Sequence, residues 1–157
     1  MNNRYLYRGK RKDNKKWIYG GIYYQKKDEM KDEAVYIITG SLSDIACAVE
    51  VIPETVGRCT ELKDKNGKLI FEGDVVRTQP FSDKPYSSKA KYKQHLGVVE
   101  YRISHFKNSL YEQDYRAEWR ANIKDYGKFV YCDWNEFFKC EVIGNIHDNP
   151  ELLEVER

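Results

Sequence analysis

Residues 54–76 read ETVGRCTELKDKNGKLIFEGDVV, and this segment carries the clearest structural signals of the chain. Near its centre is Asn66-Gly67, a pair that tolerates the positive φ angles of a tight hairpin turn. Glu72-Gly73-Asp74 forms a second sharp turn, which Asp74 is expected to brace through backbone amides. Short apolar runs flank both turns, so the segment predicts antiparallel strands joined by tight connections.

Outward from this segment, alternating polar and aromatic residues predict a hairpin near the N-terminus. Its strands are Arg4 to Arg8 and Trp17 to Tyr19, its turn is centred on Asp13-Asn14, and the second strand bends at Gly20-Gly21. Further strands are predicted at residues 35–39, 49–52, 75–77, 96–101, 129–131 and 138–143. Asn149 before Pro150 predicts one short terminal helix with Asn149 as its N-cap.

Three segments are harder to interpret. Residues 41–48 fit a short helix or a loop. Residues 108–123 fit a helix or a strand, and the alternation favours a strand for Tyr115 to Trp119. Residues 78–94 contain two Pro, several Ser and many Lys, which predicts a long exposed loop.

The bulk composition fits one soluble β-rich domain. The chain has 157 residues, and its 13 Tyr, 6 Phe and 3 Trp favour strands. Its net charge of +2 neither indicates nor excludes nucleic acid. No apolar run reaches the roughly 18 residues of a membrane span, and no signal peptide is visible. The four Cys form no C-x-x-C pair, so we expect reduced thiols and a cytoplasmic protein.

Several blocks together resemble one known family. They are VIPETVG (51–57), LKDKNGK (62–68), IFEGDVV (70–76), GVVEY (97–101) and EVIGNIHDNPELL (141–153), with RYLYR (4–8) and WIYG (17–20) at the start. In this order they resemble the YopX family. The chain departs from the family at Cys59-Thr60-Glu61, where an aromatic residue, Thr and Gly are usual. The resemblance implies a β-rich protein of phages, prophages and mobile elements. It implies no catalytic residues.

These signals combine into one predicted architecture. We expect a single YopX-like domain over residues 1–157, with an N-terminal hairpin extension in residues 1–50. Residues 51–157 should form a small SH3-like barrel core, from about Val51 to Val142, with loop 78–94 exposed and a short C-terminal helix.

The residues suited to chemistry are better explained by structural roles. Cys132, Cys140 and His147 could reach one zinc ion across adjacent strands, but small buried cysteines in strands and a turn histidine explain them better. His95 and His105 are expected to be solvated, and Glu72 beside Asp74 belongs to a turn. No glycine-rich phosphate loop is present. We therefore predict no metal, no cofactor and no small-molecule substrate.

The remaining hypotheses concern binding. Many tyrosines on strands, together with open strand edges, favour a non-enzymatic module that contacts a protein partner or assembles with itself. The alternative is nucleic acid, because cations neutralise phosphates and aromatic rings stack on bases. Its candidate residues lie in loop 78–94 and are Lys84, Lys89, Lys91, Tyr92 and Lys93, with Phe81 and Tyr86 nearby. An enzyme whose site is not visible in the sequence is the third hypothesis.

Overall fold

The computed structural model describes residues 5–26, 33–40, 48–80, 82, 86–108, 111–123, 131–132 and 139–154. Strands dominate these residues, so the predicted mostly-β class is confirmed. The chain divides into two compact units, Met1–Glu61 and Leu62–Arg157. Residues 51–61, which the sequence-based prediction grouped with the second part, lie in the first unit.

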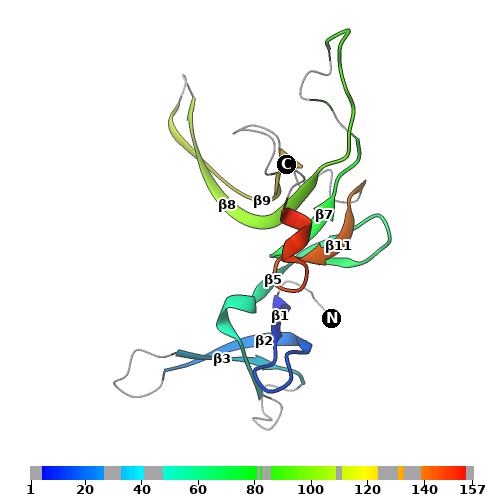
Figure 1. The fold of residues 1–157 in the computed structure, drawn as a ribbon. Coiled ribbons are helices and arrows are strands. Elements are labelled where there is room, and N and C mark those ends of the chain that lie inside the picture. The colour runs from blue at the N-terminus through cyan, green and yellow to red at the C-terminus, as the bar shows by residue number, and fades with distance from the viewer. Residues whose placement is uncertain are drawn as a thin grey trace. The chain divides into compact units, whose positions relative to one another are not determined.

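The first unit is an antiparallel sheet built outward from a hairpin (Figure 1). β2 (Trp17–Lys26) pairs with β1 (Tyr7–Lys10) on one side and with β3 (Glu33–Ile38) on the other. The predicted N-terminal hairpin is therefore confirmed. β4 (Ala48–Val51) pairs with β3, and β5 (Gly57–Lys63) pairs with β1. A turn of 3-10 helix at Pro53–Thr55 follows β4, which ends before Pro53 as expected.

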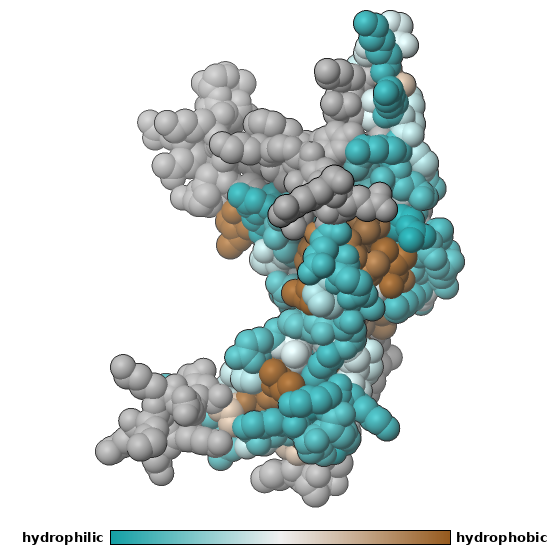
Figure 2. All heavy atoms as spheres, in the orientation of Figure 1, coloured by the Kyte–Doolittle hydropathy of each residue, from teal (hydrophilic) through white to brown (hydrophobic). Residues whose placement is uncertain are grey.

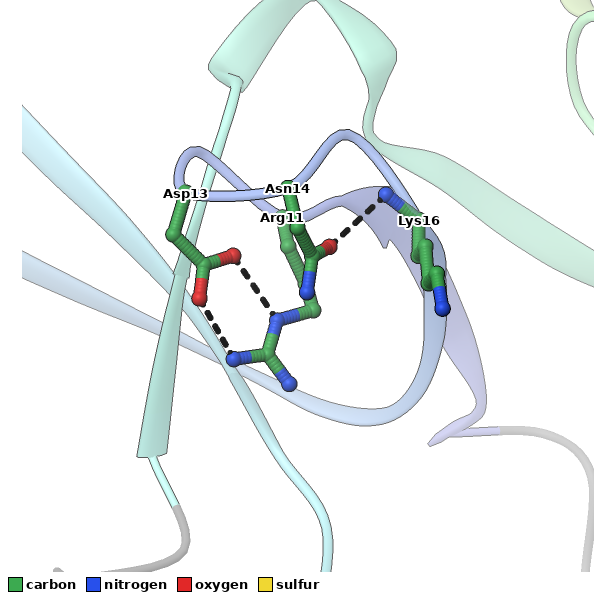
Figure 3. A network of polar contacts seen from close by, with 4 residues as sticks. All are labelled: Arg11, Asp13, Asn14 and Lys16. Atoms are coloured by element: carbon green, nitrogen blue, oxygen red, sulfur yellow. Dashed lines mark hydrogen bonds and ion pairs between the residues drawn. The ribbon is translucent and has the colours of Figure 1, made fainter.

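The turn between β1 and β2 is shaped by its own side chains (Figure 3). Arg11 donates from Nε to Asp13 Oδ1 over 2.9 Å and from Nη2 to Asp13 Oδ2 over 2.7 Å. The backbone N–H of Lys16 donates to Asn14 Oδ1 over 3.0 Å. Because these groups are exposed, the contacts direct the local path of the chain and stabilise it little.

Alternation along β2 separates a core face from an outer face. Ile18 and Ile22 pack on the buried cluster of Val35, Ile37 and Val51. Gly20 lies between those isoleucines. A Cβ at this position would lie 2.0 Å from the carbonyl oxygen of Ile38, so no other residue fits there without moving the backbone of β3.

The second unit contains a five-stranded antiparallel sheet in the order β10-β9-β8-β7-β11. Its strands are β7 (Asp74–Arg77), β8 (Leu96–Asn108), β9 (Tyr111–Ile123), β10 (Tyr131–Cys132) and β11 (Glu141–Asn145). β6 (Leu69–Phe71) lies next to β5 in the strand order. The strand favoured at Tyr115 to Trp119 is confirmed as part of β9.

The core of the second unit sits at the base of β8 and β9. Its buried cluster brings together side chains from five strands and the residue before β11, with Leu62 and Trp119 packed against it; the members are Ile70, Val76, Val99, Ala121, Cys140 and Val142. Asp64 ties this core to the β5–β6 turn. Its Oδ1 accepts from the N–H groups of Asn66 (2.8 Å) and Lys68 (2.9 Å), and its Oδ2 accepts from Val142 N–H (3.0 Å).

Two details of the predicted architecture need correction. The strand order over the described residues has free ends and does not close, so the core is not a closed SH3-like barrel. The reason lies in β8 and β9, because each has 13 residues and they pair with each other far beyond the reach of β7 and β10. The terminal helix is a single 3-10 turn at Pro150–Leu153, and the Asn149 side chain makes no capping hydrogen bond. Residues 41–47 lie outside the described residues.

Candidate functional site

The predicted turn residues occupy two compact turns of the second unit. Gly67 has a φ of 81° and Gly73 a φ of 79°, the left-handed region that favours glycine. Asp74 is buried, and its Oδ2 accepts a hydrogen bond from the Phe71 N–H over 2.9 Å. Glu72 is half-buried. Asp74 therefore supports a strand connection, which is a structural role.

Loop 78–94 is closed at its base by a pair of buried residues. The Thr78 N–H donates to the His95 carbonyl over 2.9 Å, and the His95 N–H donates to Thr78 Oγ1 over 3.1 Å. Both residues are at most 4% exposed. The expectation that His95 is solvated is therefore wrong, because this neck extends the β7–β8 ladder by one pair. The side chain of His105 lies outside the described residues.

Beyond this neck the loop presents cations and aromatic rings to solvent. Lys89, Lys91 and Lys93 are exposed, Tyr92 is 60% exposed and Tyr86 is fully exposed. Lys84 and Phe81 lie outside the described residues. The structure thus brings four of the five predicted nucleic-acid residues together on one exposed segment.

Two of the three residues considered as zinc ligands, Cys140 and His147, have described side chains. Cys140 is buried in the core cluster, and His147 is half-buried in the turn after β11. Cys59 and Cys140 are not joined in a disulfide, and the Cys132 side chain lies outside the described residues. Over the part of the chain that the structure describes, no three His, Cys, Asp or Glu side chains are grouped as a metal site.

An exposed apolar feature that sequence reasoning missed lies on the ribbon formed by β8 and β9. Pairing places Val99 opposite Ala121, Tyr101 opposite Trp119 and Ile103 opposite Ala117, so these residues share one face. Exposure rises along that face: Val99 is 1% exposed, Tyr101 45% and Ile103 58%. We call Tyr101, Ile103, Ala117 and Trp119 the apolar face of the ribbon.

The opposite face of the ribbon is charged. Arg120 is 2% exposed and donates from Nε to Glu100 Oε1 over 2.7 Å, with a second contact from Nη2 to the same oxygen. One pair further out, Arg102 lies opposite Glu118. The ribbon is thus amphipathic, with ion-pairing residues on one face and apolar residues on the other. In Figure 2, hydrophilic side chains cover most of the described surface in that view, and one apolar area lies beside the ribbon.

A signal for this face exists in the sequence. Val99, Tyr101 and Ile103 alternate with Glu100, Arg102 and Ser104, which is the period of a half-buried strand. The predicted strand ended at Tyr101, so the outer part of the pattern was not used.

Comparison with known proteins identifies the family of the chain. The family model described as "YopX protein" matches residues 6–154, which is nearly the whole chain. The chain belongs to the YopX family. None of the curated proteins matches this YopX chain. Among solved structures, it is similar to the crystal structure of protein EF1440 from Enterococcus faecalis, with 24% identity and a TM-score of 0.41, over 94% of this chain and 96% of that one.

Among the residues that the structure describes, no helix has the length and apolar character needed to cross a bilayer.

Proposed function

We propose that this YopX protein is a non-enzymatic binding module that contacts another protein through the apolar face of its β8–β9 ribbon. The observation that carries the proposal is the exposure of Tyr101 and Ile103 on the face that is buried at Val99. An accessory role in a phage or prophage is what the family resemblance implies, and we adopt it as part of the proposal.

The energetics of a bare ribbon support a partner. A two-stranded ribbon is marginally stable in water unless a third strand or another layer covers it. Burying an isoleucine or an aromatic side chain contributes roughly 1.5–3 kcal/mol. A protein surface laid against Tyr101 and Ile103 would therefore stabilise both the complex and the ribbon. On the opposite face Arg120 already pairs with Glu100, so this pair has less to gain from a partner.

The non-enzymatic part rests on the roles of the titratable residues. Asp64 and Asp74 accept hydrogen bonds from backbone amides, and His95 closes the neck of a loop. These groups hold the chain in place. The free thiols of Cys59 and Cys140 fit the cytosol of a bacterial host, where cysteines stay reduced.

Site-specific photocrosslinking in cells tests the proposal. A photoreactive phenylalanine analogue replaces Ile103 in the full chain, and a matched control carries it at Arg102, the next residue on the opposite face. We expect protein adducts from position 103 and few from position 102, identified by mass spectrometry. Equal labelling at both positions, or no protein adduct from position 103, would refute the proposed binding face.

Loop 78–94 supports a second candidate function, binding of single-stranded nucleic acid. Three exposed lysines and two exposed tyrosines share the segment from Tyr86 to Lys93, which holds no acidic residue. Lysines neutralise phosphates, and each tyrosine ring offers a stacking surface to a base.

The test compares the full chain with a variant carrying Lys89→Gln, Lys91→Gln and Lys93→Gln. Binding to a labelled single-stranded oligonucleotide should weaken in the variant and fall steeply as salt rises. The matched control carries Lys15→Gln and Lys16→Gln in the exposed β1–β2 turn. Binding that does not change with salt concentration, or that weakens equally in the control, would refute nucleic-acid binding by this loop.

A further inference from the structure

Over the residues that the structure describes, the β8–β9 ribbon has two open edges in addition to its apolar face. β7 pairs with β8 only at Leu96 to Val98, and β10 pairs with β9 only at Ala121 and Asn122. The β8–β9 pairing itself extends to Asn108 and Tyr111. Among the described strands, none flanks the outer part of β8 or of β9. Bare edges of this length are templates for a further strand.

The backbone of the outer part of β8 is oriented to accept such a strand. The carbonyls of His95 and Val99 both accept hydrogen bonds from the side away from β9, donated by Thr78 and Gly73 over 2.9 Å. Backbone groups point to alternate sides along an antiparallel strand. The N–H and C=O groups of Tyr101 and Ile103 therefore face the open edge, while those of Arg102 face β9.

The two edges carry opposite charge. The part of β8 from Tyr101 to Asn108 contains Arg102 and Lys107 and no acidic residue. The part of β9 from Tyr111 to Glu118 contains three acidic residues and one basic residue, namely Glu112, Asp114, Glu118 and Arg116. Joining two β8 edges, or two β9 edges, would bring like net charge together. Joining a β8 edge to a β9 edge brings unlike charge together, which favours that pairing.

We propose that the partner of the ribbon is a second copy of this chain, joined head to tail, with the β8 edge of one copy against the β9 edge of the next. The inference rests on the proposed function and names its partner. Strand order β8-β9-β8-β9 stays antiparallel throughout, so no reversal of either ribbon is needed. A head-to-tail contact leaves one edge open on each side, and closing the series gives a ring of at least three copies.

Ring closure also accounts for the apolar face. When a sheet closes on itself, alternate side chains point inward and are removed from contact with water. The face bearing Tyr101, Ile103 and Trp119 would line the inside of the ring. The face bearing Glu100 and Arg102 would remain outside, and on it Glu100 already pairs with Arg120.

The first test measures the mass of the purified full chain by light scattering across a range of protein concentration. We expect at least three times the 18.6 kDa of a single chain. Ile103→Pro removes an N–H that faces the open edge and leaves the β8–β9 hydrogen bonds in place, so its mass should fall to one chain. Ile103→Val is the matched control and should keep the assembly. Circular dichroism of each variant checks the fold.

A charge exchange at the ribbon tip tests the head-to-tail arrangement independently of Ile103→Pro. Lys107 and Glu112 flank the Asn108–Tyr111 pair, where the β8–β9 register shifts, so they adjoin each other across the tip of one ribbon as well. Lys107→Glu and Glu112→Lys should each weaken the assembly several-fold. An equimolar mixture of the two single variants should restore it, because every contact between the two kinds of copy then joins unlike charges while each chain by itself carries like charges. If Lys107→Glu instead strengthens a two-copy species, the contact joins two β8 edges and the head-to-tail inference is wrong.

The crosslinking experiment separates failure of this inference from failure of the proposed function. An adduct at position 103 between two copies of the chain supports both. A single-chain mass at every concentration, with an adduct to a different protein, overturns the inference and leaves the binding face intact. No protein adduct, together with a single-chain mass, overturns both.

Discussion

Asp64 joins two parts of the chain that are 78 residues apart, through its contact with Val142. Burial raises the pKa of Asp64, but hydrogen bonds donated by the amides of Val142, Lys68 and Asn66 outweigh this and hold the pKa below its ordinary value. The carboxylate of Asp64 therefore stays ionised and has a structural role. It stabilises the fold because it accepts hydrogen bonds from backbone N–H groups that would bond less well to a neutral acceptor.

Replacing Asp64 by Asn should lower the free energy of unfolding by about 2 kcal/mol. The amide keeps one oxygen and turns an NH₂ group toward a backbone N–H, so either Val142 or the pair Asn66 and Lys68 loses its acceptor. Denaturant unfolding of the two proteins measures the difference. Asp13→Asn is the control, because Asp13 lies in an exposed turn and should change stability little. Equal effects of the two substitutions would contradict a special role for Asp64.

Lowering the pH should decrease the free energy of unfolding, partly because Asp64 becomes protonated. Its pKa is lower in the folded chain, so its contribution is fully present above the unfolded value of about 3.9 and is lost as the pH falls through the folded value. We expect the unfolding free energy of the wild type to decline more steeply below about pH 4 than that of Asp64→Asn. Parallel pH profiles would show that other groups dominate acid unfolding.

Among the elements, the β8–β9 ribbon combines a firm base with an uncovered outer part. The base is held by Val99 and Ala121 in the core and by the Arg120–Glu100 pair on the opposite face. Arg120 is almost fully buried, whereas Glu100 is one-third exposed. Most of the desolvation cost therefore falls on Arg120. The Glu100 carboxylate that balances this buried charge should contribute more to stability than the partner of an exposed charge would.

Glu100→Gln should destabilise the chain by about 2 kcal/mol, because it removes the charge that balances the buried guanidinium. The control is Glu50→Gln, whose partner Lys12 is 60% exposed. Thermal unfolding of both variants at equal protein concentration tests the expectation. A larger loss from Glu50→Gln would mean that burial of Arg120 is not the deciding factor.

For the whole molecule, assembly links stability to concentration. A partner that binds only the folded chain raises its apparent stability by mass action. If copies join through the ribbon, the midpoint of thermal unfolding of the wild type should rise as protein concentration rises. The midpoint of Ile103→Pro should stay constant. A constant midpoint for both proteins, measured by calorimetry over a hundredfold range of concentration, would contradict self-assembly.

Features that depend on neighbouring residues could be predicted from the sequence. The N-terminal hairpin and the strand end before Pro53 follow from local backbone preferences, and the structure contains both. The turns at Asn66-Gly67 and Glu72-Gly73-Asp74 are of the same kind, since their glycines adopt the positive φ that such turns require. The strand at Tyr115 to Trp119 follows from alternation over a few residues. Such signals lie within one turn or one strand, where sterics and hydrogen bonding act over short distances.

Features that depend on distant residues were decided by the tertiary structure. His95 is buried because Thr78 meets it across a loop, and Asp64 is anchored because Val142 returns to it. The sheet is open and not a closed barrel because β8 and β9 extend well beyond the residues that pair with β7 and β10. No local sequence pattern encodes this difference in length. The same difference in strand length leaves Ile103 exposed on the face where Val99 is buried. Alternation in the sequence shows that a strand has an apolar face, but only the positions of the other strands determine how much of that face is covered.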